Sequence, residues 1–150
     1  MTTALNTAEI AERLSAQCAG EISCSPDYVD IAPATLADAC ACLKNELGCD
    51  YMDMLTAVDY PDRFEMIYHL LSLQNNTRIA LKVRLPRDNP SLPSLSGLWL
   101  GAVQQEREVY DLFGITFSGH PDLRRIVLWE GYEGHPLRKD FKDKAYAASD

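Results

Sequence analysis

The chain has 150 residues, of which 47% are hydrophobic and 24% are charged, and its formal net charge is −8. A chain of this length buries roughly two-thirds of its unfolded surface, so one domain can fold without disulfide or metal staples. No apolar run approaches the roughly 20 residues of a membrane-spanning helix, and the first residues lack the basic and apolar regions of a leader peptide. We therefore expect one globular domain, either cytosolic or already processed.

The excess negative charge lies in the first part of the chain. Residues 1–60 hold ten acids and two bases, whereas residues 61–150 hold twelve of each. Phosphate binding requires clustered lysine and arginine, so nucleic acid is not expected as a partner. An acidic surface facing water, or a basic partner protein, is the expectation.

Five cysteines lie in the first third of the chain, without a CxxC pair or a nearby histidine. Zinc and iron–sulfur sites depend on such spacings. The pattern favours reduced thiols that act as small core residues over a metal site. These residues are Cys18, Cys24, Cys40, Cys42 and Cys49.

Two helices are predicted before residue 50. Asn6 and Glu9 have the spacing of a capping box, and Gly20 suits the end of that first helix. The second helix begins at Pro33, carries apolar residues at helical spacing and ends at Gly48. The segment between them, with β-branched and aromatic residues around a Ser-Pro turn, predicts a short strand.

The hydrophobic period then changes to two. Residues 78–85 alternate apolar and basic side chains, as a half-buried strand does, and a polar linker joins them to the preceding apolar run. Residues around 52–86 therefore predict three neighbouring antiparallel strands. The proline-rich stretch 86–96 is expected to be a loop outside any sheet. The predicted fold is α/β of the α+β type: a mostly antiparallel mixed sheet, covered on one face by the N-terminal helices.

A long helix is predicted at about 97–113, with Gly114 as its C-cap. Glu106 falls in the middle of the apolar stripe of this helix, Arg107 flanks the stripe, and Glu108 and Asp111 lie farther toward the polar side. The residues of the stripe are Trp99, Ala102, Val103, Tyr110 and Phe113.

A carboxylate on a buried stripe needs a cation, several hydrogen-bond donors or a proton. One interpretation is a structural ion-pair network in which Glu106 is buried and pairs with Arg124, Arg125 or Arg138. The other makes Glu106 a general acid or base with His120 as its partner. The sequence nearby supplies no nucleophile, phosphate loop or metal set, so the structural network is favoured.

The end of the chain combines apolar side chains with residues that break regular structure. A short strand is possible at 126–128, but glycine and proline prevent helix or strand formation beyond it. Its aromatic and basic residues suit an interface that becomes ordered on docking, and packing on its own domain is an equal alternative. We therefore divide the chain into a domain, residues 1–128, and an extended docking tail, residues 129–150. The apolar residues of this tail are Trp129, Tyr132, Leu137 and Phe141.

The stretch EREVYDLFGITFSGHPDLRRIVLWEGYEGHPLRKDF, residues 106–141, closely resembles the signature region of the 30-kDa-type subunit of proton-pumping NADH:quinone oxidoreductase, respiratory complex I. The strands and the long helix also follow the order of that family, so the resemblance covers about residues 50–142. The matching positions include Leu112, Phe113, Ile126 and Val127. The residues that we assign to an interface or structural role are Glu106, Arg107, Glu108, Asp111, His120, Arg124, Arg125, Trp129, Leu137, Arg138, Lys139, Asp140 and Phe141.

The resemblance implies a subunit of the peripheral arm with no catalytic, cofactor-binding or metal-binding residues of its own. Flavin and iron–sulfur clusters are expected in partner subunits. The implied partner is the large quinone-site subunit, on the cytoplasmic side of an energy-converting membrane or the matrix side in an organelle. The membrane is reached only through the complex. The alternatives are the equivalent subunit of a membrane-bound nickel–iron hydrogenase or ferredoxin-linked complex, a free-standing adaptor, and a small soluble enzyme.

Overall fold

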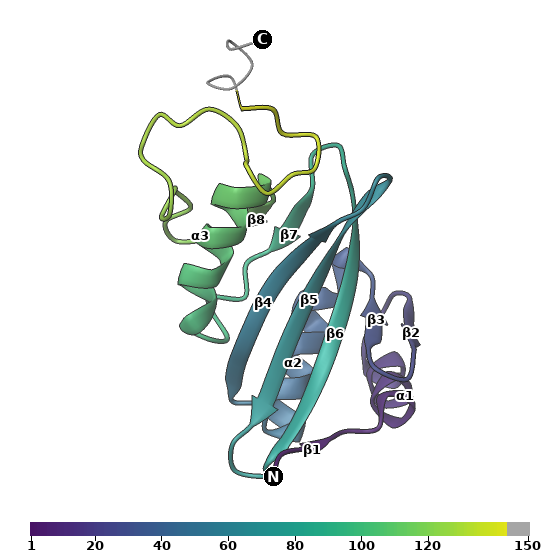
Figure 1. Ribbon diagram of the computed structural model, residues 1–150. Coiled ribbons are helices and arrows are strands. Elements are labelled where there is room, and N and C mark those ends of the chain that lie inside the picture. Colours follow the sequence, from purple (N-terminus) through teal and green to yellow (C-terminus); the bar gives the residue numbers. More distant parts are fainter. Residues whose placement is uncertain (144–150) are drawn as a thin grey trace.

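The computed structural model describes residues 1–143, which form one mixed sheet, a second small sheet and three α-helices (Figure 1). Residues 144–150 of the predicted docking tail lie outside this part of the chain. No helix within residues 1–143 is long and apolar enough to span a bilayer. The elements in chain order are β1 (Thr3–Ala4), α1 (Thr7–Gln17), β2 (Ile22–Cys24), β3 (Val29–Ile31), the 3-10 helix η1 (Pro33–Thr35), α2 (Leu36–Leu47), β4 (Tyr51–Asp59), β5 (Arg63–Ser72), β6 (Thr77–Pro86), β7 (Ser91–Pro93), α3 (Gly101–Phe113) and β8 (Thr116–Ser118).

The large sheet has the order β2-β3-β6-β5-β4, and β1 also pairs with β6. The three long strands β4, β5 and β6 are antiparallel, whereas β1 and β3 run parallel to β6. This arrangement confirms the predicted α+β fold with a mostly antiparallel mixed sheet. The alternation of residues 78–85 places Ile79, Leu81, Val83 and Leu85 in the core.

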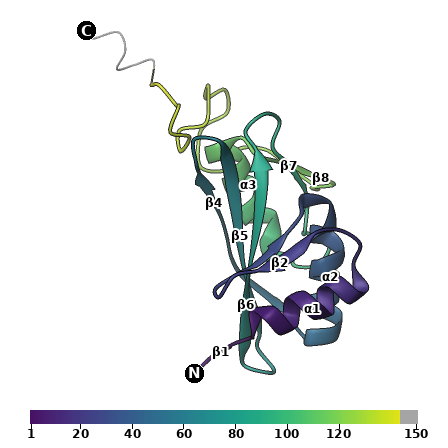
Figure 2. The ribbon, with the colours of Figure 1, turned by 90° about the vertical axis from the view of Figure 1, so that its right-hand side faces the viewer.

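The two N-terminal helices cover one face of this sheet (Figure 2). The side chain of Asn6 accepts hydrogen bonds from the backbone N–H groups of Ala8 and Glu9, which fixes the start of α1. Gly48 ends α2 in the left-handed conformation, with φ of 67°. Helix α3 lies beside the edge strand β4, where the Gln105 side chain accepts from the backbone N–H of Leu55 at 2.6 Å.

The cysteines divide between core and surface. Cys40 and Cys49 are buried, which confirms the expectation of core thiols for these two, whereas Cys24 is exposed. Burial raises the pKa of the Cys49 thiol to about 11, and burial also raises that of Cys40. In the described part of the chain, no group of three or more His, Cys, Asp or Glu side chains is arranged to hold a metal ion.

The proline-rich stretch after β6 is more ordered than the sequence predicts. Its strand β7 pairs in parallel with β8, and Leu92 lies opposite Phe117. The expectation of a loop outside any sheet is therefore wrong. The prolines do not prevent the pairing, because the donors come from other residues: Thr116 donates to the carbonyl of Pro90, and Ser94 donates to that of Ser118.

Two boundaries also differ from the predictions. Helix α3 begins at Gly101 rather than near residue 97, because the preceding residues form turns in which the N–H groups of Leu98 and Trp99 both bond to the carbonyl of Leu95. The prediction of a possible short strand at 126–128 is wrong. The three N–H groups of that segment bond to a side chain of α3 instead of to another strand.

Candidate docking site on helix α3 and the C-terminal segment

Glu106 is fully buried on α3, as the sequence predicts, but its partners are not arginines. The Ser94 hydroxyl donates to its Oε2 at 2.6 Å, and the backbone N–H of Leu95 donates to its Oε1 at 2.7 Å. Burial raises the pKa of Glu106, although both hydrogen bonds favour the charged form. The predicted arginine pairing is wrong because the segment before α3 supplies these donors.

His120 lies beside Glu106 and is held by the main chain. Its Nε2 is 3.0 Å from the carbonyl of Val103 and 3.8 Å from Oε2 of Glu106. Its Nδ1 accepts from the N–H of Asp122 at 2.9 Å, so the ring proton belongs on Nε2. Both side chains of the pair are buried, which leaves no approach for a substrate and favours the structural interpretation.

Asp111 was expected toward the polar side of the helix, but it is fully buried. Its Oδ2 accepts from three consecutive backbone N–H groups, at 3.1, 2.8 and 2.9 Å, and its Oδ1 pairs with Arg125 at 2.7 Å. Burial opposes ionisation, but the hydrogen bonds from Leu128, Arg125 and Val127 outweigh it and lower the pKa of Asp111. The loop that follows β8 folds over this side of α3, which is why the helical pattern alone misplaced the residue.

Arginines hold the carbonyl groups of the same loop. Arg107, also buried, donates to the main-chain carbonyls of Arg124 and Arg125, at 3.1 Å each. The guanidinium of Arg125 donates in turn to the carbonyls of Tyr132 and Gly134. The side chain of Arg124 points away and pairs with exposed Asp122. The loop is thus fixed chiefly through its backbone.

The C-terminal segment caps helix α3. The last carbonyls of a helix have no partner within the helix. Here the carbonyl of Asp111 lies 2.9 Å from Nδ1 of His135, and that of Leu112 accepts from the N–H of Leu137 at 3.0 Å. The carbonyl of Phe113 accepts from the guanidinium of Arg138. The segment therefore packs on its own domain, which was one of the two alternatives left open by the sequence.

Another buried carboxylate, Asp59 at the end of β4, holds the C-terminal segment farther along the chain. It accepts from the backbone N–H of Lys139 at 2.7 Å and pairs with Arg87. The guanidinium groups of Arg87 and Arg138 both lie over the ring of Phe64, at 4.9 and 5.1 Å from its centroid. Asp59 and Arg87 were missed by the sequence analysis. The sequence contained a sign of this pair. Asp59 follows the core residues of β4 at intervals of two, so its side chain points into the core, and a buried carboxylate needs a cation.

The remaining predicted residues lie at the surface. Glu108 is exposed and, together with Leu137, lines a groove of about 280 Å³ between α3 and β4. Asp140 is exposed, 3.4 Å from Arg87, and the ring of Phe141 stacks on Tyr132.

Four apolar side chains near these anchoring contacts remain in water. Ile126 is 42% exposed, Val127 58%, Trp129 69% and Leu137 52%. We call these four residues the tail anchors, of which Ile126 and Val127 lie just before the tail predicted at residues 129–150. A small domain gains little by leaving such side chains in solvent, so they mark candidate contact residues. The fold and the site together define an α+β domain that presents apolar anchors on a backbone tied to one helix.

Comparison with known proteins places this domain in a family. Residues 29–147 match the family described as respiratory-chain NADH dehydrogenase, 30 Kd subunit. A NADH-quinone oxidoreductase subunit of Roseiflexus sp. (strain RS-1) is 45% identical over 147 residues, covering 91% of this chain and 84% of that protein. The corresponding subunit of Moorella thermoacetica is 52% identical over 102 residues, covering 67% and 69%. The chain belongs to the family of the 30 kDa subunit of respiratory-chain NADH dehydrogenase.

Two solved structures share the fold. A trypsin-resistant fragment of Nqo5 superposes with a TM-score of 0.66 at 29% identity, covering 79% of this chain and all of that fragment. One component of the membrane-bound sulfane sulfur reductase, an archaeal respiratory membrane complex, superposes with a TM-score of 0.71 at 24% identity, covering 93% and 85%. The second likeness concerns the fold alone.

Proposed function

We propose that this chain is a non-redox subunit in the peripheral arm of a respiratory NADH:quinone oxidoreductase. In this role it docks through the tail anchors onto the large quinone-site subunit and supports it. The complex transfers electrons from NADH to quinone and couples this transfer to proton translocation. The chain lies on the cytoplasmic side of the membrane, or the matrix side in an organelle, and the electron carriers reside in its partners. Family membership supports the parent complex, and the exposed tail anchors support the docking role.

The observation that carries the docking role is the contrast between backbone and side chains at residues 126–137. The backbone is fastened by Asp111, Arg107 and Arg125, whereas the side chains of the tail anchors are exposed. A surface that is fixed before docking loses less conformational entropy when the partner binds. Large aromatic side chains such as Trp129 are also the residues that most often dominate interface energies.

The test replaces the natural chain in its own membranes with a Trp129→Ala, Leu137→Ala double variant. We expect the amount of assembled complex on a native gel to fall about tenfold or more, because two interface anchors are removed. NADH:quinone activity per assembled complex should stay unchanged, because these residues do not take part in electron transfer. The control is Leu73→Ala, an equally apolar and 64% exposed side chain in the turn between β5 and β6.

Two results would overturn the proposal. Normal assembly of the double variant would remove the docking role. Normal assembly with lost electron transfer would instead assign the segment a direct part in the chemistry. The purified chain should also lack flavin and iron–sulfur absorbance, and a stoichiometric chromophore would contradict the non-redox role.

A further inference from the structure

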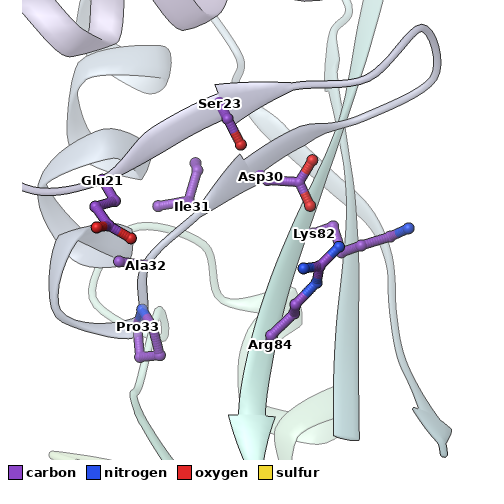
Figure 3. Close-up of a pocket in the computed structure, with 8 residues that line it drawn as sticks. All are labelled: Glu21, Ser23, Asp30, Ile31, Ala32, Pro33, Lys82 and Arg84. Atoms are coloured by element: carbon purple, nitrogen blue, oxygen red, sulfur yellow. The ribbon is translucent and has the colours of Figure 1, made fainter. Parts of the chain in front are cut away.

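Two hollows in the surface of the domain differ in how their charges are balanced. The hollow where β3 leaves β6 has a volume of about 300 Å³ and is lined by two acids, Glu21 and Asp30, and two bases, Lys82 and Arg84. Figure 3 shows the guanidinium of Arg84 directed toward the carboxylate of Asp30. With equal numbers of acids and bases, this hollow requires no charge from a partner.

The groove of about 280 Å³ between α3 and β4 has no such balance. Apolar side chains form most of its walls: Met54 of β4 is 41% exposed there, and Val109 and Leu112 contribute from α3. Among the described residues that line the groove, Glu108 is the one ionisable side chain. It is exposed, and its carboxylate forms no ion pair or hydrogen bond within residues 1–143.

The basic residues next in sequence to Glu108 and Leu137 do not neutralise this carboxylate, because they are engaged elsewhere. Arg107 donates to main-chain carbonyls of the loop after β8. Arg138 donates to the carbonyl of Phe113, at the end of α3. The groove therefore keeps a negative charge on a largely apolar lining.

Leu137 connects this groove with the proposed docking residues, because it is a tail anchor and also lines the groove. A partner that covers Leu137 therefore reaches the groove and removes water from the carboxylate of Glu108. A carboxylate withdrawn from water needs a cation or hydrogen-bond donors, since an unpaired buried charge is strongly destabilising. The net charge of −8 on the whole chain also favours the approach of a cationic group.

The size and lining of the groove distinguish between possible occupants. Its volume lies just below the range of about 300–1,000 Å³ that is typical of sites for small molecules, so it suits a single side chain better than a cofactor. Lysine and arginine combine an apolar stem with a charged end. Such a stem matches the apolar walls, and such a charged end matches Glu108.

We infer that the groove between α3 and β4 receives a lysine or arginine side chain of the subunit that docks onto the tail anchors, and that Glu108 pairs with its charged group. This inference rests on the proposed function, because one partner covers both Leu137 and the groove. Glu108 is thereby a specificity-determining residue of the interface. A partner with an acidic or a purely apolar side chain at this position leaves the carboxylate unpaired and binds less well.

The first experiment reverses the charge of Glu108 in the native membranes. Glu108→Lys should reduce the amount of assembled complex on a native gel about tenfold or more, because it places like charges across the interface. Glu108→Gln, which removes the charge and keeps the shape, should lose less. The matched control is Glu12→Lys, the same change on an exposed residue of α1, which should leave assembly unchanged. Urea unfolding of the purified Glu108→Lys chain should match that of the wild type, which separates a lost contact from a misfolded domain.

The outcomes distinguish this inference from the proposed function. Equal assembly of Glu108→Lys and Glu12→Lys would overturn the inference. The docking role would still stand if the Trp129→Ala, Leu137→Ala variant lost assembly. It would fall as well if that double variant assembled normally.

The second experiment identifies the occupant by cross-linking. A photoreactive analogue of methionine at Met54, in the intact complex, should attach to a partner residue that is, or directly adjoins, a lysine or arginine. The same probe at exposed Leu73, in the turn between β5 and β6, should not attach to that site. Attachment from position 54 to a partner site without an adjoining lysine or arginine would contradict the inference, and so would the absence of any partner cross-link.

Discussion

At the residue scale, Asp111 is the side chain on which the path of the chain after β8 depends. One carboxylate receives three backbone N–H groups and an arginine, while the carbonyl of the same residue lies within hydrogen-bond distance of His135. The charge is matched and every oxygen is used, which is the condition under which a buried ionised group is tolerated. Its removal strands both the arginine and the three donors.

The first prediction is that Asp111→Ala lowers the free energy of unfolding by about 3–5 kcal/mol, because a buried ion pair loses one partner. Urea unfolding followed by circular dichroism measures the change. The control is Asp122→Ala, which breaks the exposed pair with Arg124 and should change stability little, because solvent screens an exposed pair. If both variants lost the same stability, the assignment of Asp111 as the anchor of this loop would be wrong.

A second prediction concerns the pH dependence of Glu106. Its pKa is raised in the folded protein, so between its ordinary value and the raised value the folded state binds more protons than the unfolded state. The contribution of this carboxyl to stability therefore falls as pH rises through that window. Asp111 and Asp59, whose pKa values are lowered, act in the opposite sense and lose their contribution as pH falls.

Glu106→Gln separates these effects, since the amide can keep the bonds to Ser94 and Leu95 without titrating. We expect the stability of Glu106→Gln relative to the wild type to increase from about pH 4.5 upward, the ordinary range of a glutamate, and then to level off. Urea titrations at a series of pH values measure this difference. Glu108→Gln on the exposed side of α3 controls for net charge, and a difference independent of pH would contradict the prediction.

At the element scale, the end of α3 depends on a close approach of two segments. Gly114 has φ of 75°, and a Cβ atom there would lie 2.6 Å from Cδ2 of His135. The histidine contacts the carbonyl of Asp111, so a larger residue at 114 disturbs the contact between the helix and the C-terminal segment. Gly119 has nearly the same φ, 77°, but open space around it.

A comparison of these two glycines separates the stability cost of backbone strain from the added cost of a steric clash. Gly119→Ala should cost about 1–2 kcal/mol, the penalty for an L-residue in the left-handed region. Gly114→Ala should cost clearly more, because it adds the displacement of His135. Thermal and urea unfolding of both variants provide the comparison. Equal losses would show that the segment does not pack against the end of α3 as described.

The elements that the sequence predicted well are those with local signals. Strand β6 alternates along its whole length, and the ends of α2 and α3 carry glycine caps, so short-range physics determines them. The partners of Glu106 had no such signal. Ser94 and Leu95 reach it only because β7 pairs with β8, and that contact joins segments distant in the sequence.

The burial of Asp111 could not be predicted from local sequence either. Its position on the helical pattern is polar, and only the loop folding back over α3 buries it. The helical spacing of apolar residues identifies the side of α3 that packs against the sheet. It does not show that a later loop covers another side of the same helix. The arginines were expected to neutralise a carboxylate. Arg125 does so, but for Asp111 rather than Glu106, while Arg138 donates to the carbonyl of Phe113 and Arg124 pairs with Asp122.

At the scale of the whole molecule, the apolar side chains that stabilise the fold and those exposed to solvent lie in different places. The sheet face that meets α1 and α2 holds the main apolar cluster, whereas the tail anchors are exposed. The fold is therefore stabilised mainly from one side. Changes to the tail anchors should alter association more than stability, which is the pattern that the proposed docking role requires.

The hydrogen bonds from residues 126–128 to Asp111 also have a consequence for which sequence changes this loop can accept. Because the carboxylate grips only main-chain N–H groups, which every residue except proline possesses, the side chains of Ile126 and Val127 are not needed to keep the loop in place. The position of the loop backbone therefore does not depend on which side chains the loop exposes. Residues here can be exchanged to suit a different neighbour while the scaffold beneath them stays the same, so one fold can serve in assemblies whose contact surfaces have little chemistry in common.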